Sequence, residues 1–158
     1  MFTQFPLSQH WVDNRQFSRS QDHLQNQGAA ITAFKRAKKR AAWRRLRARL
    51  TLQSVQLKHY PPTSLQSTKH AAQGIQNIAI DQIIGSEGRN HDFDNQFWPI
   101  TEHSRDRWVN IAVAIGSGIP LPPVQLVRTA KGYIVRDGNH RVSVARAFGQ
   151  EVIEAEIV

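Results

Sequence analysis

Residues 132–149 read Gly-Tyr-Ile-Val-Arg-Asp-Gly-Asn-His-Arg-Val-Ser-Val-Ala-Arg-Ala-Phe-Gly. The pattern predicts a short strand that turns at a glycine directly into a helix. Such a corner leaves unpaired backbone N–H groups at the helix N-terminus, where the helix dipole adds partial positive charge. Gly138 lets the backbone approach a phosphate, and His140 and Arg141 supply hydrogen-bond donors. This stretch therefore predicts an anion-binding corner.

The residues around this corner predict the fold class. Pro122-Pro123 leads into a strand at 124–127, and a closing strand follows at 152–158. Further upstream, an alternating segment predicts a first strand that begins near Ile78 and ends at Gly85. Between these strands, four apolar residues at helical spacing predict a helix that packs on the core. These residues are Trp108, Ile111, Ala112 and Ile115. We expect a small α+β domain over residues 75–158, a mixed sheet with packed helices.

This order of elements, with its Gly-x-His-Arg turn, resembles the superfamily of ParB N-terminal domains and sulfiredoxins. Sulfiredoxins carry Gly-Cys-His-Arg at the corresponding turn and bind ATP phosphates, ParB proteins carry Gly-Glu-Arg-Arg and bind CTP, and related free serine kinases carry a similar Asp-Gly-x-His-Arg turn. The resemblance covers residues 76–158. It implies a nucleoside triphosphate or diphosphate as ligand, ATP or CTP, with its phosphates on Gly138, Asn139, His140 and Arg141.

The departures from the superfamily limit what the resemblance implies. Sulfiredoxin chemistry needs a thiolate where this chain has Asn139, and the chain contains no cysteine. Reduction of a sulfinic acid is therefore excluded. Partition proteins of the ParB family continue into a helix-turn-helix and a dimerisation domain, whereas this sequence ends at Val158.

Other polar residues are candidates for the same site. The candidate catalytic groups are His140 and the three carboxylates of the 87–94 loop, which are Glu87, Asp92 and Asp94. Asp92 and Asp94 are also candidate Mg²⁺ ligands. A solvated loop with internal ion pairs explains the same residues. Arg105, in the first turn of the middle helix, is a further candidate phosphate contact. Asp137 is expected to cap the helix that follows the corner.

The positive charge of the chain is concentrated in one segment. The net charge is +9, and residues 31–50 carry nine cations and no acid. The nine are Lys35, Arg36, Lys38, Lys39, Arg40, Arg44, Arg45, Arg47 and Arg49. Such a segment gains from a polyanion that releases counterions on binding, so RNA or DNA is the expected partner. An anionic membrane surface is less favoured because the apolar stripe is narrow.

The rest of the chain divides into segments by composition. Residues 1–28, rich in Gln, Asn and Ser, are expected to be disordered. Residues 29–57 are expected to form a basic amphipathic helix, with its apolar stripe at Phe34, Ala42, Leu46 and Leu50. Pro61 and Pro62 end it, and residues 58–74 are expected to be a linker.

These observations favour a cytoplasmic protein, because the sequence has no secretory signal and no apolar run long enough to cross a membrane. The leading hypothesis is a nucleotide-phosphate-binding domain joined to a helix that contacts nucleic acid. The alternatives are a phosphoryl-transfer enzyme, such as a small-molecule kinase, nucleotide hydrolase or nuclease, and a DNA-associated protein that has lost nucleotide binding. Which nucleotide binds, and the oligomeric state, stay open.

Overall fold

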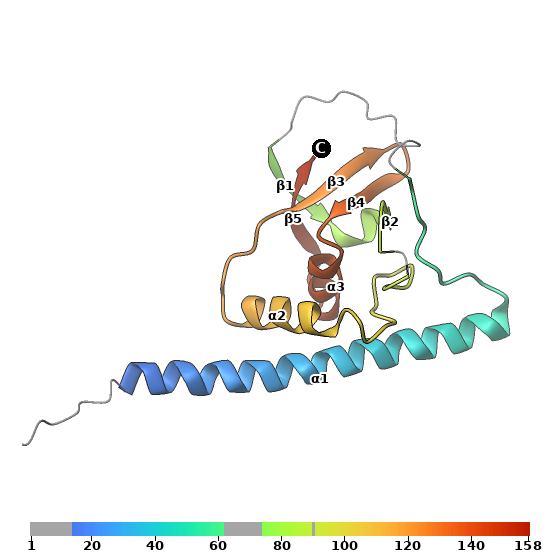
Figure 1. Ribbon diagram of the computed structural model, residues 1–158. Coiled ribbons are helices and arrows are strands. Elements are labelled where there is room, and N and C mark those ends of the chain that lie inside the picture. The colour runs from blue at the N-terminus through green and yellow to red at the C-terminus, as the bar shows by residue number, and fades with distance from the viewer. Residues whose placement is uncertain (1–13, 62–73, 90) are drawn as a thin grey trace, which may run out of the picture.

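The computed structural model describes residues 14–61, 74–89 and 91–158 (Figure 1). In this part of the chain three α-helices accompany a five-stranded mixed sheet, which confirms the α+β class. The helices are α1 (Asn14–Thr51), α2 (Arg105–Gly116) and α3 (Asn139–Ala147). The strands are β1 (Ile75–Ala79), β2 (Ile83–Ser86), β3 (Val124–Thr129), β4 (Gly132–Asp137) and β5 (Val152–Ile157).

The sheet has the strand order β1-β5-β3-β4-β2. β3 and β4 form the expected antiparallel hairpin, β5 runs parallel to β3 and antiparallel to β1, and β2 runs parallel to β4. The single first strand expected to end at Gly85 is instead two strands. A short 3₁₀ turn at Ile80–Gln82 separates β1 from β2 and sends them to opposite edges of the sheet.

The helices form layers on one side of the sheet. Figure 1 shows α3 next to the sheet, α2 beside α3, and the long α1 furthest from the strands. Trp108 of α2 is fully buried, as its place on the apolar stripe predicts, and its Nε1 donates to Ser143 Oγ of α3 at 2.9 Å. The ring of Phe34 from α1 meets Trp108 edge-on, with 5.5 Å between the ring centroids. One core therefore joins all three helices to the sheet.

Helix α1 differs from the segment expected at 29–57. It begins at Asn14, so residues 14–28, expected to be disordered, are helical, and it ends at Thr51. Its buried stripe consists of Phe34 and four alanines, whereas Ala42, Leu46 and Leu50 of the expected stripe are exposed; the alanines are Ala30, Ala37, Ala41 and Ala48. Small side chains let α1 approach α2 closely, and this favours the alanine face as the buried one.

The expected linker at 58–74 is also different where it is described. The backbone N–H of Tyr60 donates to the carbonyl oxygen of Ser86 at 3.0 Å, and the N–H of Ser86 donates to the carbonyl oxygen of Lys58 at 3.1 Å. These residues therefore pair with the edge strand β2. The remainder of that linker, 62–73, and the first part of the expected tail, 1–13, lie outside the described residues. No helix in the described ranges is long and apolar enough to span a bilayer.

Candidate functional site

The corner between β4 and α3 has the predicted geometry. β4 ends at Asp137, and Gly138 is the N-cap of α3 with φ 105°. A Cβ at this position would lie 2.6 Å from Val124 Cγ1, so both the backbone angle and the packing require glycine. Among the described residues no side chain caps α3. The positive end of α3 is thus left to other partners, and the expectation of a cap at Asp137 is wrong.

His140 is the buried side chain at this corner. It is 4% exposed, and its Nε2 has no hydrogen-bond partner among the described residues. Burial, followed by the nearby charges of Arg89 and Arg107, lowers the pKa of His140 from 6.5 to about 4. The imidazole is therefore neutral at pH 7 and sits in a field that opposes its protonation. The same field attracts an anion.

Arg141 is already engaged by the protein. Its Nη1 donates to the carbonyl oxygens of Pro122 and Pro123, the latter at 2.9 Å, and its Nη2 donates to the Asp137 carboxylate at 2.5 Å. These bonds tie the start of α3 to the chain entering β3. Arg141 therefore braces the corner, and Asp137 offsets its charge.

Two other arginines bring positive charge to the corner. Arg89 and Arg107 line a small hollow of about 30 Å³, together with Ile111 of α2 and residues 137–141. Neither arginine was among the site residues expected from the sequence. The expected arginine was Arg105, which does not line the hollow and instead lies close enough to Glu102 to lower the pKa of that carboxyl, after the larger effect of Lys38.

The helical period explains why Arg107, and not Arg105, lines the hollow. Two residues turn a helix by about 200°, so Arg105 and Arg107 lie on nearly opposite faces. Arg107 and Ile111 are four residues apart and share a face. Because α3 packs against this side of α2, the i, i+4 relation to the apolar stripe was the signal that pointed to Arg107.

Asn139 is the second buried polar side chain at the corner. Asn139 is 7% exposed, and its side-chain oxygen is buried without a hydrogen-bond partner among the described residues. This oxygen is an acceptor, so a ligand satisfies it only through a donor such as a hydroxyl or amino group, and not through an ionised phosphate oxygen. Asn139 and His140 both line the hollow at the positive end of α3.

The three candidate carboxylates do not line this hollow. Glu87 pairs with Arg136 at 3.0 Å. Asp92 pairs with Arg89 at 3.2 Å and accepts a hydrogen bond from Thr101 at 3.1 Å. Of the three, Asp92 acts electrostatically on His140, since its charge favours protonation of that imidazole.

Asp94 has a structural role. It is 1% exposed, accepts the Arg44 Nε hydrogen bond at 3.0 Å, and accepts the backbone N–H groups of Gln96 and Trp98 at 2.8 and 3.0 Å. This carboxylate holds its loop to α1. In the described part of the chain no group of three or more His, Asp or Glu side chains is placed to hold a metal ion, so Asp92 and Asp94 do not form a Mg²⁺ cluster with a third ligand.

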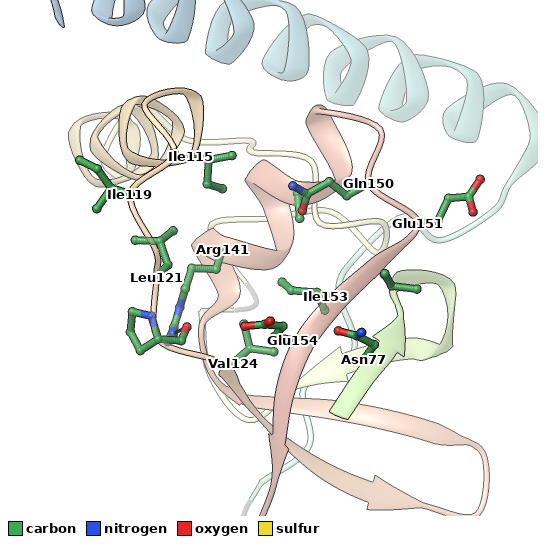
Figure 2. Close-up of a pocket in the computed structure, with 14 residues that line it drawn as sticks. Asn77, Ile115, Ile119, Leu121, Val124, Arg141, Gln150, Glu151, Ile153 and Glu154 are labelled. Atoms are coloured by element: carbon green, nitrogen blue, oxygen red, sulfur yellow. Dashed lines mark hydrogen bonds between the residues drawn. The ribbon is translucent and has the colours of Figure 1, made fainter. Parts of the chain in front are cut away.

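A larger groove adjoins the corner (Figure 2). It has a volume of about 630 Å³, and its apolar lining includes Ile115, Leu121 and Ile153. Polar groups from the β1–β5 side line it as well, and they are Asn77, Gln150, Glu151 and Glu154. Arg141 lines both the groove and the small hollow, and Ile115 follows Ile111 by one turn of α2. The two hollows are therefore neighbours, one cationic and one apolar.

The nine cations of α1 fall into two groups. Lys38 pairs with Glu102, Arg40 lies 5.0 Å from the ring centroid of Trp98, and Arg44 pairs with Asp94. The other six have no ion-pair partner in the described ranges, and we call them the unpaired cations: Lys35, Arg36, Lys39, Arg45, Arg47 and Arg49. Three cations thus fasten α1 to the domain, and six are left for a partner.

Comparison of the chain with protein-family models, with curated proteins and with solved structures found no match. The corner, the groove and the charges of α1 are therefore the features that point to a function.

Proposed function

We propose that the protein binds a phosphorylated small molecule of nucleotide size, with its phosphates at the corner between β4 and α3 and its base in the adjoining groove. The observation that carries the proposal is the buried side chain of His140, whose Nε2 has no hydrogen-bond partner among the described residues, at the positive end of α3. Arg89 and Arg107 supply the neutralising charge.

The groove supports a ligand larger than phosphate. A volume of about 630 Å³ lies in the range of small-molecule sites, and a mainly apolar lining with a few polar groups suits a flat heterocycle. Glu154 and Asn77, which are paired across β1 and β5, offer partners for the edge of a base. The resemblance of the Gly-x-His-Arg turn to the ParB and sulfiredoxin superfamily favours ATP or CTP, with any Mg²⁺ carried on the phosphates.

A phosphoryl-transfer enzyme has less support. Each of the three candidate carboxylates is held in an ion pair, and none of them lines the hollow. His140 is neutral and has a free ring nitrogen, so it can donate to a phosphate oxygen without acting as a base.

Isothermal titration of the full chain with ATP, CTP and pyrophosphate, each with Mg²⁺, tests the proposal. Arg107→Ala should weaken binding by about tenfold to a hundredfold, the range for a lost hydrogen bond to a charged group. Arg105→Ala, on the same helix but away from the hollow, is the matched control and should bind as the parent does. Equal affinities of parent and Arg107→Ala would show that the corner does not hold the phosphates.

A second variant separates the base from the phosphates. Leu121→Trp fills the groove, so it should weaken the binding of nucleotides while pyrophosphate binds unchanged. If both ligands bind as before, the base does not occupy the groove.

We also propose that α1 binds nucleic acid, because its six unpaired cations repel one another and gain from a polyanion. Replacing Arg45, Arg47 and Arg49 by Ala should lower the affinity for DNA or RNA and reduce the slope of log affinity against log salt. That slope changes by about 0.9 for each lost duplex phosphate contact. An unchanged slope would mean that another surface binds.

A further inference from the structure

The solvent face of α1 carries three large apolar side chains that the core does not use. Trp43 is 58% exposed, Leu46 is 50% exposed and Leu50 is 82% exposed. Nine residues separate Phe34 from Trp43, and at about 100° per residue this places Trp43 half a turn away from the buried stripe. The tryptophan therefore points away from the domain.

Cations stand on both sides of this ring along the helix. Lys39 precedes Trp43 by four residues and Arg47 follows it by four, so each lies on the same face at about 6 Å along the axis. Both are among the unpaired cations. The other two tryptophans of the described chain, Trp98 and Trp108, are buried, and Trp98 already lies under Arg40.

We propose that this face of α1 binds single-stranded nucleic acid, with an unpaired base stacked on Trp43 and the flanking phosphates on Lys39 and Arg47. The inference rests on the proposed nucleic-acid function of α1 and names its substrate class. A row of cations alone would favour a duplex, because a duplex carries the higher charge density. An exposed ring between cations favours a single strand, because a base in a duplex is already stacked and only an unpaired base offers its face.

Leu46 and Leu50 extend the apolar surface beside the ring. The same three side chains suit an anionic membrane surface less well. Lys35, Arg36 and Lys39 lie within the same arc of the helix, and an interfacial helix keeps such an arc apolar and its cations on the opposite face. The buried stripe of α1 cannot insert into a membrane surface, since it faces the domain core.

Fluorescence anisotropy of the full chain with labelled oligo(dT) and oligo(U), and with a hairpin duplex of the same number of phosphates, tests the proposal across a salt series. Trp43→Ala should weaken single-strand binding by roughly five- to a hundredfold, as loss of a base–aromatic stack does. The duplex affinity and the salt slope should stay as in the parent. Trp43→Phe should restore most of the single-strand affinity.

Leu50→Ala is the matched control, because it removes an exposed apolar side chain from the same face without removing a ring. It should change single-strand affinity by less than about threefold. Because Trp43 is exposed, none of these variants removes a core contact, and a thermal melt checks that each is folded.

The possible results separate the inference from the function on which it rests. If the parent binds oligonucleotides and Trp43→Ala binds the single strand equally well, stacking is refuted and the nucleic-acid function stands. If the parent binds neither single strand nor duplex, the stacking inference and the nucleic-acid function of α1 are both refuted. If it instead binds vesicles of phosphatidylserine and phosphatidylcholine, and Trp43→Ala abolishes that, the face is a membrane surface and the inference is overturned.

Discussion

Acidification should destabilise the fold through His140. The imidazole is 4% exposed, and burial together with Arg89 and Arg107 lowers its pKa from 6.5 to about 4. The difference between these two values, at about 1.4 kcal/mol for each pH unit, amounts to about 3 kcal/mol. That is a large part of the stability of a protein of this size.

The sign of the pH effect on the free energy of unfolding follows from proton uptake. Between pH 6.5 and about pH 4 the unfolded chain binds a proton on His140 that the folded chain does not bind. The contribution of His140 to the free energy of unfolding is therefore constant above pH 6.5, falls as the pH drops through this window, and levels off below pH 4. A bound phosphate should raise the pKa of His140, because it offsets the arginine charges that lower it.

Urea denaturation at a series of pH values measures this contribution. Paired carboxylates also lose stability in acid, so the useful quantity is the difference between the parent and a variant that cannot titrate at residue 140. His140→Phe keeps the ring beside Phe93, whose centroid lies 5.1 Å from that of His140, and removes the partnerless nitrogen. His140→Gln is a second such variant.

The expected result is a difference curve that changes by about 3 kcal/mol between pH 6.5 and 4 and is flat above. His103→Gln, at an exposed position, controls for the loss of one histidine. A difference curve for His140→Phe that is flat through the whole range would refute the neutral, buried imidazole. It would also remove the electrostatic argument for an anion site at this corner.

Three further substitutions test the fold and the site. Gly138→Ala should cost about 1–3 kcal/mol of stability, measured by thermal melting, because φ is 105° and the new Cβ would lie 2.6 Å from Val124 Cγ1. Phe34→Ala should lower the free energy of unfolding by about 3–5 kcal/mol in a single denaturant transition, and a separate α1 transition would contradict the shared core. Asp94→Ala should cost about 3 kcal/mol because it removes the buried carboxylate that accepts from Arg44 Nε and from the backbone N–H groups of Gln96 and Trp98, while nucleotide affinity by titration stays within a few-fold; loss of binding at unchanged stability would restore Asp94 as a site residue.

The corner could be predicted from the sequence because its signals are local. The strand, the glycine at positive φ and the following helix are specified within residues 132–149, and the structure has them as expected. The hairpin and the helix that carries Trp108 were predictable for the same reason, since their turn residues and apolar spacing are local.

The buried face of α1 could not be predicted in the same way. Periodicity weights large apolar residues, so it favoured Leu46 and Leu50, whereas the structure buries Ala37 and Ala41. Alanine is a weak hydrophobic signal but permits close packing of two helices. These two leucines were then left on the solvent face of α1, the face that also carries Trp43.

The partners of the loop carboxylates depend on the tertiary structure. Asp94 meets Arg44 and Glu87 meets Arg136, pairs that lie 50 and 49 residues apart in the chain. The sequence placed an arginine within the loop and suggested local pairing, which holds for Asp92 with Arg89 alone. Charge clusters in loops therefore identify acidic groups without identifying what neutralises them.

The loop at 92–102 supports both candidate sites. Asp94 and Glu102 fasten it to Arg44 and Lys38 of α1, and Phe93 packs edge-on against His140 at the corner between β4 and α3. The loop therefore contacts α1 through Asp94 and Glu102 and the β4–α3 corner through Phe93, so a lost activity after a change in the loop does not by itself identify a ligand contact. Arg107 lies on α2 and Trp43 on α1, both outside this loop. Changes at these two residues can therefore separate nucleotide binding from nucleic-acid binding, and an effect of one change on both ligands would mean that the two sites are coupled through the fold.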